Sequence, residues 1–468
     1  MSRPRAKISL GLILAVLLVP RGIQASPRAP EELVTASIRP NVLASGAQAA
    51  TPDNSTPAAT RSRDTLETQK KVTTYTLPPD LYKKAVDLGR IHFRFSLIGF
   101  FYGLVVLWIV LQFRLAPKYR DWAEKASGNP FVQALIFAPS LLLTMGVLGL
   151  PSDIYENMVS RQYGLSIQSW GSWFWDWSKG QFLSVGLGII VICGLYSIIR
   201  KSPRRWWLYF WLISLPFTVF LVFLQPVVVD PMFHKFEPLQ MKDPALTASL
   251  EQMVQHAGEN IPPERMFWMG AGEKTTTLNA YVTGIGASKR IVVWDTTIAK
   301  MSTPQIVFVA GHEMGHYMLG HIWKGLALAA LLSFVLLYLA FRTIGWLLAR
   351  WGGDWGIRGV NDLASLPALL LLLSVFMFIA NPLTSAFSRH DEHQADQYGL
   401  EVTRGLTPDS SQVAAQAFQI LGEVDLSNPE PNPLDILMFY SHPAIPDRIH
   451  FALTYDPWSK GEQPEFVK

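Results

Sequence analysis

The chain carries the stretch His312-Glu313-Met314-Gly315-His316 between two strongly apolar segments. Residues four apart share one face of a helix, so both imidazoles can reach one metal ion. Glu313 then faces the same space, where its carboxylate can take a proton from a metal-activated water. Because such a set hydrolyses amide bonds at neutral pH, the stretch predicts a zinc protease built into a membrane.

The composition of the chain agrees with a membrane location. Of its 468 residues, 49% are hydrophobic and 16% are charged. Soluble proteins of this length usually carry about 25% charged residues. The apolar residues gather in runs of roughly 20, the length that crosses a bilayer core. The net charge is +4, but the basic residues lie mostly beside these runs, so nucleic acid is not expected as a partner.

The single cysteine limits the choice of metal ligands. Cys193 lies inside an apolar run, which excludes an internal disulfide framework and argues against a thiolate metal site. Any zinc must therefore be held by histidine and carboxylate side chains.

The N-terminal residues are expected to lie outside the folded part of the chain. Residues 1–26 combine basic residues with a short apolar run, which predicts a signal peptide, with an uncleaved N-terminal anchor as the alternative. Residues 27–75 are rich in Pro, Ala, Ser and Thr. They cannot bury enough apolar surface to fold and are expected to form a disordered tether.

Apolar runs divide the rest of the chain. Residues 76–226 are expected to hold four spans, at about 94–114, 130–150, 181–199 and 206–226. The first part of the protease domain follows at 227–323, a transmembrane hairpin at 324–384 (spans 324–348 and 363–384), and the second part at 385–468. We expect a helix around 244–257 and strands near 265–269, 278–283 and 290–295. Thr303 can cap the helix of His312, and Ser302 is a neighbouring option.

Loop charges predict the orientation of the spans. Two loops are basic: one holds Arg114, Lys118, Arg120 and Lys125, and the other holds Arg200, Lys201, Arg204 and Arg205. Basic loops favour the cytoplasmic side, so alternation places His312 on the opposite side, periplasmic for a bacterial inner membrane. Lys83, Lys84, Arg90 and Arg94 on the predicted outer side disagree with this orientation.

A hydrolytic zinc ion needs a third protein ligand and one open position. The best candidate is Glu392, which lies in the polar stretch 388–396. Asp396 lies four residues later, on the same helix face, and can accept a hydrogen bond from a ligand imidazole. His390, His393 and Asp391 are rival ligands in the same stretch.

Six blocks resemble, in order, the type I CAAX prenyl proteases, a family of membrane-embedded gluzincin endopeptidases. His312 to His321 resembles the zinc helix of that family, and Glu392 with Gln394, Ala395 and Asp396 matches its third-ligand motif. The other blocks are Leu148 to Gly164, Pro231 to Leu239, Asn279-Ala280-Tyr281 with the strand from Lys289 to Thr296, and Ser441-His442-Pro443 with Arg448. The likeness covers about 94–455 and indicates a bacterial-type member.

The resemblance assigns roles to individual residues. It implies one Zn²⁺ per chain, held by His312, His316 and Glu392, with Glu313 as general base and Asp396 beside the ligands. It further implies that His442 stabilises the oxyanion of the tetrahedral intermediate, that Arg448 contacts the acidic cluster, and that Asn279, Ala280 and Tyr281 meet an extended substrate strand.

The resemblance also predicts a fold: a mainly α, polytopic membrane protein whose gluzincin-like zinc domain contains a small β-sheet and is split by the transmembrane hairpin. His234 and His393 depart from the residues common in the family, and six spans are clear here where eukaryotic members have seven. Those members open their active sites to the cytosol, which favours the opposite orientation.

The expected function is endoproteolysis of membrane-associated or unfolded polypeptides. Two alternatives are a proteolytically inert membrane scaffold or insertion factor and a metal hydrolase acting on lipid. The intact Glu313 argues against the first, because an inert relative would be free to lose it. The Asn279-Ala280-Tyr281 strand favours peptide over lipid as the substrate.

Overall fold

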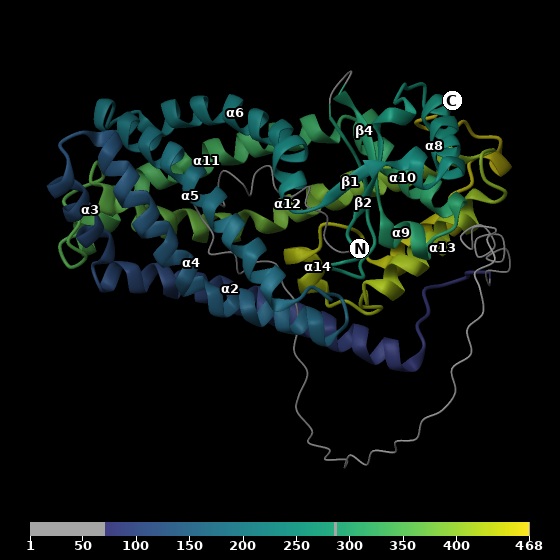
Figure 1. Ribbon diagram of the computed structural model, residues 1–468, viewed down its shortest axis with the longest axis horizontal. Coiled ribbons are helices and arrows are strands. Elements are labelled where there is room, and N and C mark those ends of the chain that lie inside the picture. The colour runs from purple at the N-terminus through teal and green to yellow at the C-terminus, as the bar shows by residue number, and fades with distance from the viewer. Residues whose placement is uncertain (1–70, 285–287, 468) are drawn as a thin grey trace, which may run out of the picture.

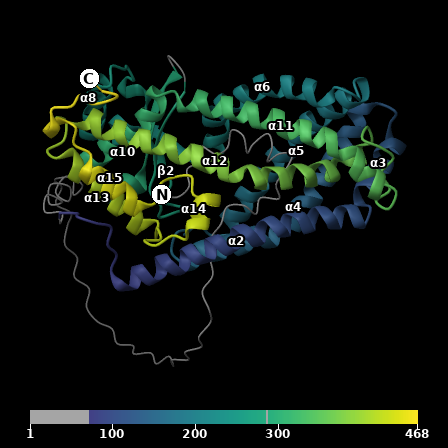
Figure 2. The same ribbon diagram turned by 180° about the vertical axis from the view of Figure 1, so that it is seen from behind.

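The computed structural model describes residues 71–284 and 288–467. Long helices run side by side from one end of the molecule towards a mixed unit of strands and shorter helices at the other end (Figure 1; Figure 2 gives the reverse view). This arrangement confirms the mainly α, polytopic fold with a small sheet. The predicted signal peptide or anchor at 1–26 and the tether up to residue 70 lie outside the described residues.

Five helices of the described chain are long and apolar enough to cross a membrane. They are α2 (Pro79–Gln112), α4 (Pro130–Gln162), α5 (Trp170–Lys201), α11 (His321–Trp351) and α12 (Leu366–Thr403). A sixth span arises if α6 (Trp206–Leu224) is joined to the short helices Gln225–Val229 and Asp230–Met232, from which it is bent by 41°. All six predicted spans therefore fall largely on helices, and α2, α4, α5 and α12 each extend by ten residues or more beyond one end of their span.

The longest of these helices changes the expected layout. α12 continues without a break through residue 384, where the hairpin was expected to end, and carries Glu392 and Asp396 on its last turns. Pro382 lies inside this helix and does not break it. One helix thus joins the bilayer to the candidate ligand.

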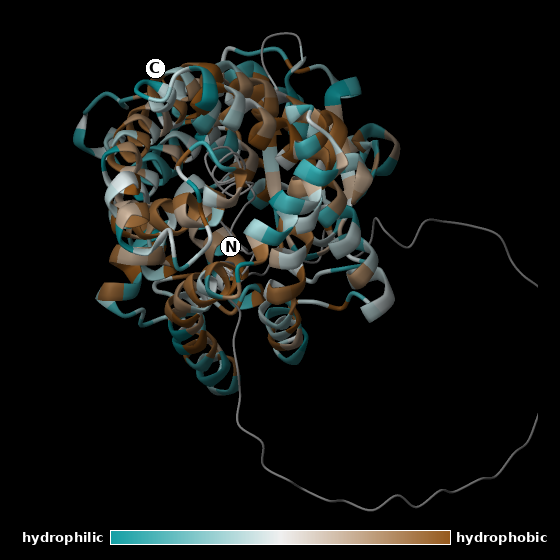
Figure 3. Cartoon of the chain, turned by 90° about the vertical axis from the view of Figure 1, so that its left-hand side faces the viewer, coloured by the Kyte–Doolittle hydropathy of each residue, from teal (hydrophilic) through white to brown (hydrophobic). Residues whose placement is uncertain are grey.

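The two basic loops lie at one end of the bundle, far from the mixed unit. α3 (Leu115–Ala126) caps this end, and its buried Arg120 donates to Asp362 in the segment that joins α11 to α12. Arg200 of the second basic loop donates to the Asn361 carbonyl of the same segment. Figure 3 looks onto this end, where polar residues of the connecting segments face the viewer.

Two large hydrophobic cores contain most of the buried apolar residues that the structure describes. The first fills the bundle and includes Phe137, Ile192 and Trp206. The second fills the mixed unit around Phe308 and Phe418, where burying each such ring contributes roughly 1.5–3 kcal/mol to stability. Large apolar side chains also face outward from the bundle helices, as with Phe182 at 77% exposure and Trp346 at 64%. Lipid is the solvent that such a face requires.

The mixed unit contains a four-stranded sheet in the order β1-β2-β4-β3. Its strands are β1 (Lys235–Pro238), β2 (Met266–Gly270), β3 (Ala280–Thr283) and β4 (Arg290–Trp294). β2 and β4 are parallel, and β1 and β3 run antiparallel to them. The three predicted strands are confirmed, whereas β1 was not predicted because Lys-Phe-Glu-Pro is short, charged and ends in proline.

The helix of the zinc motif, α10 (Thr303–Met318), lies against this sheet. Its cap is Ser302 rather than Thr303, because Ser302 forms a capping box with Gln305, whose side chain accepts from the Ser302 N–H at 2.9 Å. A capping box requires Glu or Gln three residues after the cap. Gln305 meets that spacing from Ser302 and not from Thr303.

The remaining helices surround α10 and α12. They are α7 (Leu239–Lys242), α8 (Pro244–His256), α9 (Asp295–Lys300), α13 (Ser410–Val424), α14 (Pro433–Phe439) and α15 (Ile445–Thr454). Short 3₁₀ turns lie at Pro263–Arg265, Leu363–Ser365 and Trp458–Lys460. The predicted helix at 244–257 is confirmed as α8.

Candidate active site

Three glycines let α10 and α12 approach closely enough to form a site. A Cβ added to Gly315 of α10 would lie 2.9 Å from the Tyr398 Cβ, and one added to Gly399 of α12 would lie 3.1 Å from the His312 backbone nitrogen. Gly311 meets Val402 in the same way, at 2.8 Å. Any larger residue would push the two helices apart. This close crossing brings Glu392 within reach of both histidines of the motif.

The side chains of His312, His316 and Glu392 converge on one point. Their ligand atoms all lie within 4.8 Å of one another. The two Nε2 atoms are 3.2 Å apart, and Glu392 oxygens lie 3.4 Å from His312 Nε2 and 3.7 Å from His316 Nε2. Two histidines and one carboxylate form the ligand set of many hydrolytic zinc sites.

The unsatisfied atoms at this point fit a cation. Glu392 is buried, and its Oε2 has no hydrogen-bond partner within the described chain. Two ring nitrogens that both offer lone pairs at 3.2 Å repel each other unless a proton or a cation lies between them. A buried carboxylate oxygen without a partner is costly. A bound metal would satisfy all three groups together.

A buried ion pair supports His312 from behind. Asp396 Oδ1 lies 2.8 Å from His312 Nδ1, and Arg448 Nε donates to Asp396 Oδ2 at 2.8 Å. Asp396 is 1% exposed and Arg448 2% exposed, and Arg448 also stacks on the Phe418 ring at 4.3 Å. Asp396 thus fixes the proton on Nδ1 and leaves Nε2 as the metal-facing nitrogen.

Glu313 and His442 complete the polar surroundings. Burial raises the pKa of Glu313 to about 7, which suits a group that must take and return a proton near neutral pH. His442 Nε2 lies 2.9 Å from Glu392 Oε1, and its Nδ1 lies 2.9 Å from the Ser441 hydroxyl. Burial lowers the pKa of His442, although the Glu392 carboxylate opposes the shift. A neutral His442 can therefore donate one hydrogen bond at this site.

The rival ligands lie elsewhere. His390 and His393 are exposed, and the His393 ring packs 4.2 Å from the Phe451 ring. Asp391 is buried but faces His321, with 3.8 Å between Asp391 Oδ1 and His321 Nε2. None of the three belongs to the converging group.

The predicted substrate strand is β3, which forms one edge of the sheet and packs beside α10. The Asn279 N–H donates to the Thr297 hydroxyl, and the Asn279 carbonyl accepts from the Trp294 N–H. Backbone groups alternate in direction along an antiparallel strand. Ala280 therefore presents its N–H and C=O to the free edge, while those of Asn279 are already bonded. The Tyr281 hydroxyl lies 3.3 Å from Asp230.

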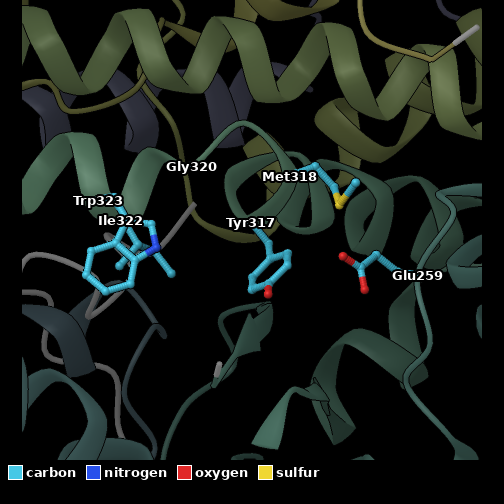
Figure 4. Close-up of a pocket in the computed structure, with 6 residues that line it drawn as sticks. All are labelled: Glu259, Tyr317, Met318, Gly320, Ile322 and Trp323. Atoms are coloured by element: carbon cyan, nitrogen blue, oxygen red, sulfur yellow. The ribbon is translucent and has the colours of Figure 1, made fainter. Parts of the chain in front are cut away.

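A small pocket opens beside the end of α10. Glu259, Tyr317, Met318, Gly320, Ile322 and Trp323 line it (Figure 4). None of the converging ligands is among these residues, so this pocket is separate from the metal position. Lys289 forms an ion pair with Glu259, and its Nζ lies 4.3 Å from the centre of the Tyr317 ring. Lys289 therefore links these two lining residues to the sheet.

One residue of this site was assigned no role from the sequence. That residue is His321, which is buried and whose Nδ1 lies 3.0 Å from His316 Nδ1. A histidine that directly follows the glycine ending a metal-binding helix was the available signal.

Known proteins resemble both halves of the chain. Residues 64–235 match the family model "CAAX prenyl protease N-terminal, five membrane helices", and residues 240–455 match "Peptidase family M48". A Bacillus subtilis protein described as an uncharacterized metalloprotease, YhfN, is 37% identical over 357 residues, 75% of this chain and 82% of that protein. CAAX prenyl protease 1 of Saccharomyces cerevisiae is 25% identical over 433 residues, 84% of this chain and 91% of that protein.

A solved structure has the same fold. The crystal structure of S. mikatae Ste24p superposes with a TM-score of 0.70 at 23% identity, covering 83% of this chain and 93% of that chain. The similarities extend over both the membrane helices and the mixed unit. The chain belongs to the CAAX prenyl protease family of M48 membrane metallopeptidases.

Proposed function

We propose that the chain is a zinc-dependent endopeptidase that cleaves membrane-associated or unfolded polypeptides. Family membership implies a metal ion, typically zinc. The observation that carries the proposal is the convergence of His312, His316 and Glu392 around one point, with a buried Glu392 oxygen that lacks a hydrogen-bond partner among the described residues. These three side chains would hold one zinc ion and leave a position open for water and substrate.

Each neighbouring side chain has a definable role in this proposal. A zinc ion here would act as a Lewis acid that lowers the pKa of water and polarises the scissile carbonyl. Glu313 would accept a proton at its carboxylate and return it to the leaving amine. Asp396, held by Arg448, would keep the Nδ1 proton on His312. His442 would donate from Nε2 to the developing oxyanion.

The free edge of β3 would hold the substrate in an extended form. Ala280 would offer its N–H and C=O to the peptide, as strand addition requires. Asn279 and Tyr281 would flank the peptide and hold Ala280 in position. The Asn279 N–H is bonded to the Thr297 hydroxyl, and the Tyr281 hydroxyl is bonded to Asp230. Backbone recognition suits unfolded segments of varied sequence. CAAX-type cleavage is a narrower proposal, supported by the names of distant relatives.

Metal analysis of Glu392→Ala tests the zinc assignment. We expect strongly reduced zinc in this variant, because two histidines alone leave the ion without its third protein ligand. His390→Ala and His393→Ala are matched controls from the same helix and should keep full zinc content. Full occupancy in Glu392→Ala, with loss in either control, would overturn the assignment.

His442→Ala should lower turnover more than substrate binding. The expected loss is roughly 2–4 kcal/mol of transition-state stabilisation, because one oxyanion donor is removed. Steady-state kinetics on a fluorogenic peptide would give kcat and KM separately. A purely structural role for the Ser441-His442 turn would instead appear as lower stability with unchanged kcat in the folded fraction.

We further propose that the active site faces the periplasm of a bacterial inner membrane. Both basic loops lie at the end of the bundle opposite the site, and basic loops favour the cytoplasm. A reporter that fluoresces only in the cytoplasm, fused after Lys468, should stay dark, because the C-terminus shares the active-site end. The same reporter inserted in the Arg200–Arg205 loop should be bright. The reverse pattern would invert the orientation.

A further inference from the structure

The turn between α10 and α11 folds His321 back onto the candidate metal ligands. Gly320 adopts a left-handed backbone conformation, with φ at +67°, and α11 begins at the next residue. This conformation is unfavourable for residues other than glycine. As a result the His321 side chain, only 4% exposed, meets the rear of the His316 ring.

The protons in this contact can be assigned from chemistry alone. His316 points Nε2 at the converging group, so its Nδ1 must carry the proton and act as a donor. The atom 3.0 Å from His316 Nδ1 is His321 Nδ1, which must therefore accept. His321 then carries its own proton on Nε2, and that nitrogen lies 3.1 Å from Gln394 Oε1, an acceptor. Each donor in the chain meets one acceptor.

We propose that His321 is the positioning residue of His316: it accepts a hydrogen bond from the His316 Nδ1–H and is itself held in place by Gln394. The inference rests on the proposed zinc site. It makes α12 the origin of all the support: Glu392 is a ligand, Asp396 holds His312 directly, and Gln394 holds His316 through His321.

The two histidine ligands are supported differently. His312 is held by a carboxylate that is itself paired with Arg448, whereas His316 is held by a neutral imidazole and an amide. Hydrogen bonds that involve an ion are roughly twice as strong as those between neutral groups. His316 is therefore the ligand whose orientation depends most on geometry, and His321 supplies that geometry.

His321 does not act as a fourth ligand. Its Nδ1 is engaged on the side of the His316 ring opposite the metal-facing Nε2, and its Nε2 faces Gln394. Asp391, the other acceptor nearby, is 3.8 Å away and beyond hydrogen-bonding distance. His321 thus influences the metal only through His316.

Two substitutions at His321 separate positioning from packing. His321→Phe keeps a ring of similar size and removes the acceptor. His321→Asn places an amide oxygen close to the position of Nδ1 and restores the acceptor in a smaller side chain. We expect zinc to dissociate into excess chelator 10- to 100-fold faster from His321→Phe, the usual effect of removing a group that orients a ligand. His321→Asn should stay within about threefold of wild type, because the acceptor is retained.

Cobalt substitution gives a second measurement that does not depend on activity. The visible absorption bands of Co²⁺ should shift in His321→Phe and return towards wild type in His321→Asn, because they report ligand geometry. Gln394→Met removes the acceptor at the far end of the hydrogen-bonded series and should accelerate zinc loss less than His321→Phe does. In the double variant of His321→Phe and Gln394→Met, zinc loss should be no faster than in His321→Phe alone. If His321→Phe does not fold, the rate of zinc loss from Gln394→Met tests the inference by itself.

The exposed His393, next to Gln394 on α12, provides the control, since His393→Phe should leave both measurements unchanged. Equal zinc loss from His321→Phe and His321→Asn would reduce His321 to a packing residue, and wild-type rates in Gln394→Met and His321→Phe would reject the inference. Failure of the zinc site itself is distinguishable, because the wild-type protein would then hold no stoichiometric zinc to release.

Discussion

Glu313→Gln is expected to keep zinc and the fold while losing hydrolysis. The amide has nearly the same shape as the carboxylate but cannot take a proton from water. General-base catalysis contributes roughly 10²- to 10⁴-fold, so turnover should fall by at least that factor. The elevated pKa of Glu313, about 7, fits a group that exchanges protons near neutral pH. Peptide cleavage by the purified protein in detergent, with zinc content measured on the same sample, tests the expectation.

The outcome has a matched comparison within the motif. Glu313→Asp keeps the carboxylate but withdraws it by one methylene, so it should retain more activity than Glu313→Gln at equal zinc content. Near-normal turnover in Glu313→Gln would remove the metalloprotease mechanism. If Glu313→Gln is inactive as expected, comparing membrane proteomes of cells that express wild-type and Glu313→Gln protein would identify substrates, which should accumulate uncleaved in the variant.

Arg448→Met should cause the largest loss of stability. It removes the only guanidinium that pairs with Asp396 among the described residues and leaves a carboxylate at 1% exposure with His312 as its remaining partner. Breaking one side of a buried ion pair costs about 3–5 kcal/mol. The midpoint of thermal unfolding should drop accordingly, and zinc content should fall because His312 loses its fixed orientation.

Two further variants show whether the unpaired charge is the cause. Combining Arg448→Met with Asp396→Asn removes the charge as well as its partner, so part of the lost stability should return. Arg358→Met breaks an exposed ion pair with Glu124 at the other end of the bundle and should change the midpoint little. A double variant no more stable than Arg448→Met would mean that packing against Phe418, and not charge, dominates.

Local patterns explain which parts of this molecule could be predicted from sequence. Runs of about 20 apolar residues located all six span helices, and the three short segments expected to be strands correspond to β2, β3 and β4. The ends of the helices were harder to predict. The polar residues that follow residue 384 signal departure from lipid, but they favour a helix as much as a loop, and packing against α10 decides for the helix.

The metal site, too, could be predicted from the sequence only in part. Spacing placed His312 and His316 on one helix face. It could not decide between Glu392, Asp391 and His393, because it does not show which side of α12 meets α10, and the family resemblance made that choice. The glycines at 311, 315 and 399 settle that contact. The role of His321 depends on the left-handed backbone conformation of Gly320. This turn brings His321 against His316, five residues earlier, a contact that the spacing of a continuous helix does not predict.

The hairpin formed by α11 and α12 also has a mechanical consequence. α12 rises about 40 Å from Leu366 to Glu392 at 1.5 Å per residue, and α11 begins at His321, which contacts His316. Both α11 and α12 are long helices that lie partly in the hydrocarbon core. α11 begins at His321 and α12 carries Glu392, so both reach the proposed metal site. A helix that is longer than the hydrocarbon core tilts further in a thinner bilayer, so a change in bilayer thickness would move the ends of α11 and α12 that carry His321 and Glu392. The bilayer would then take part in setting the geometry of the proposed metal site.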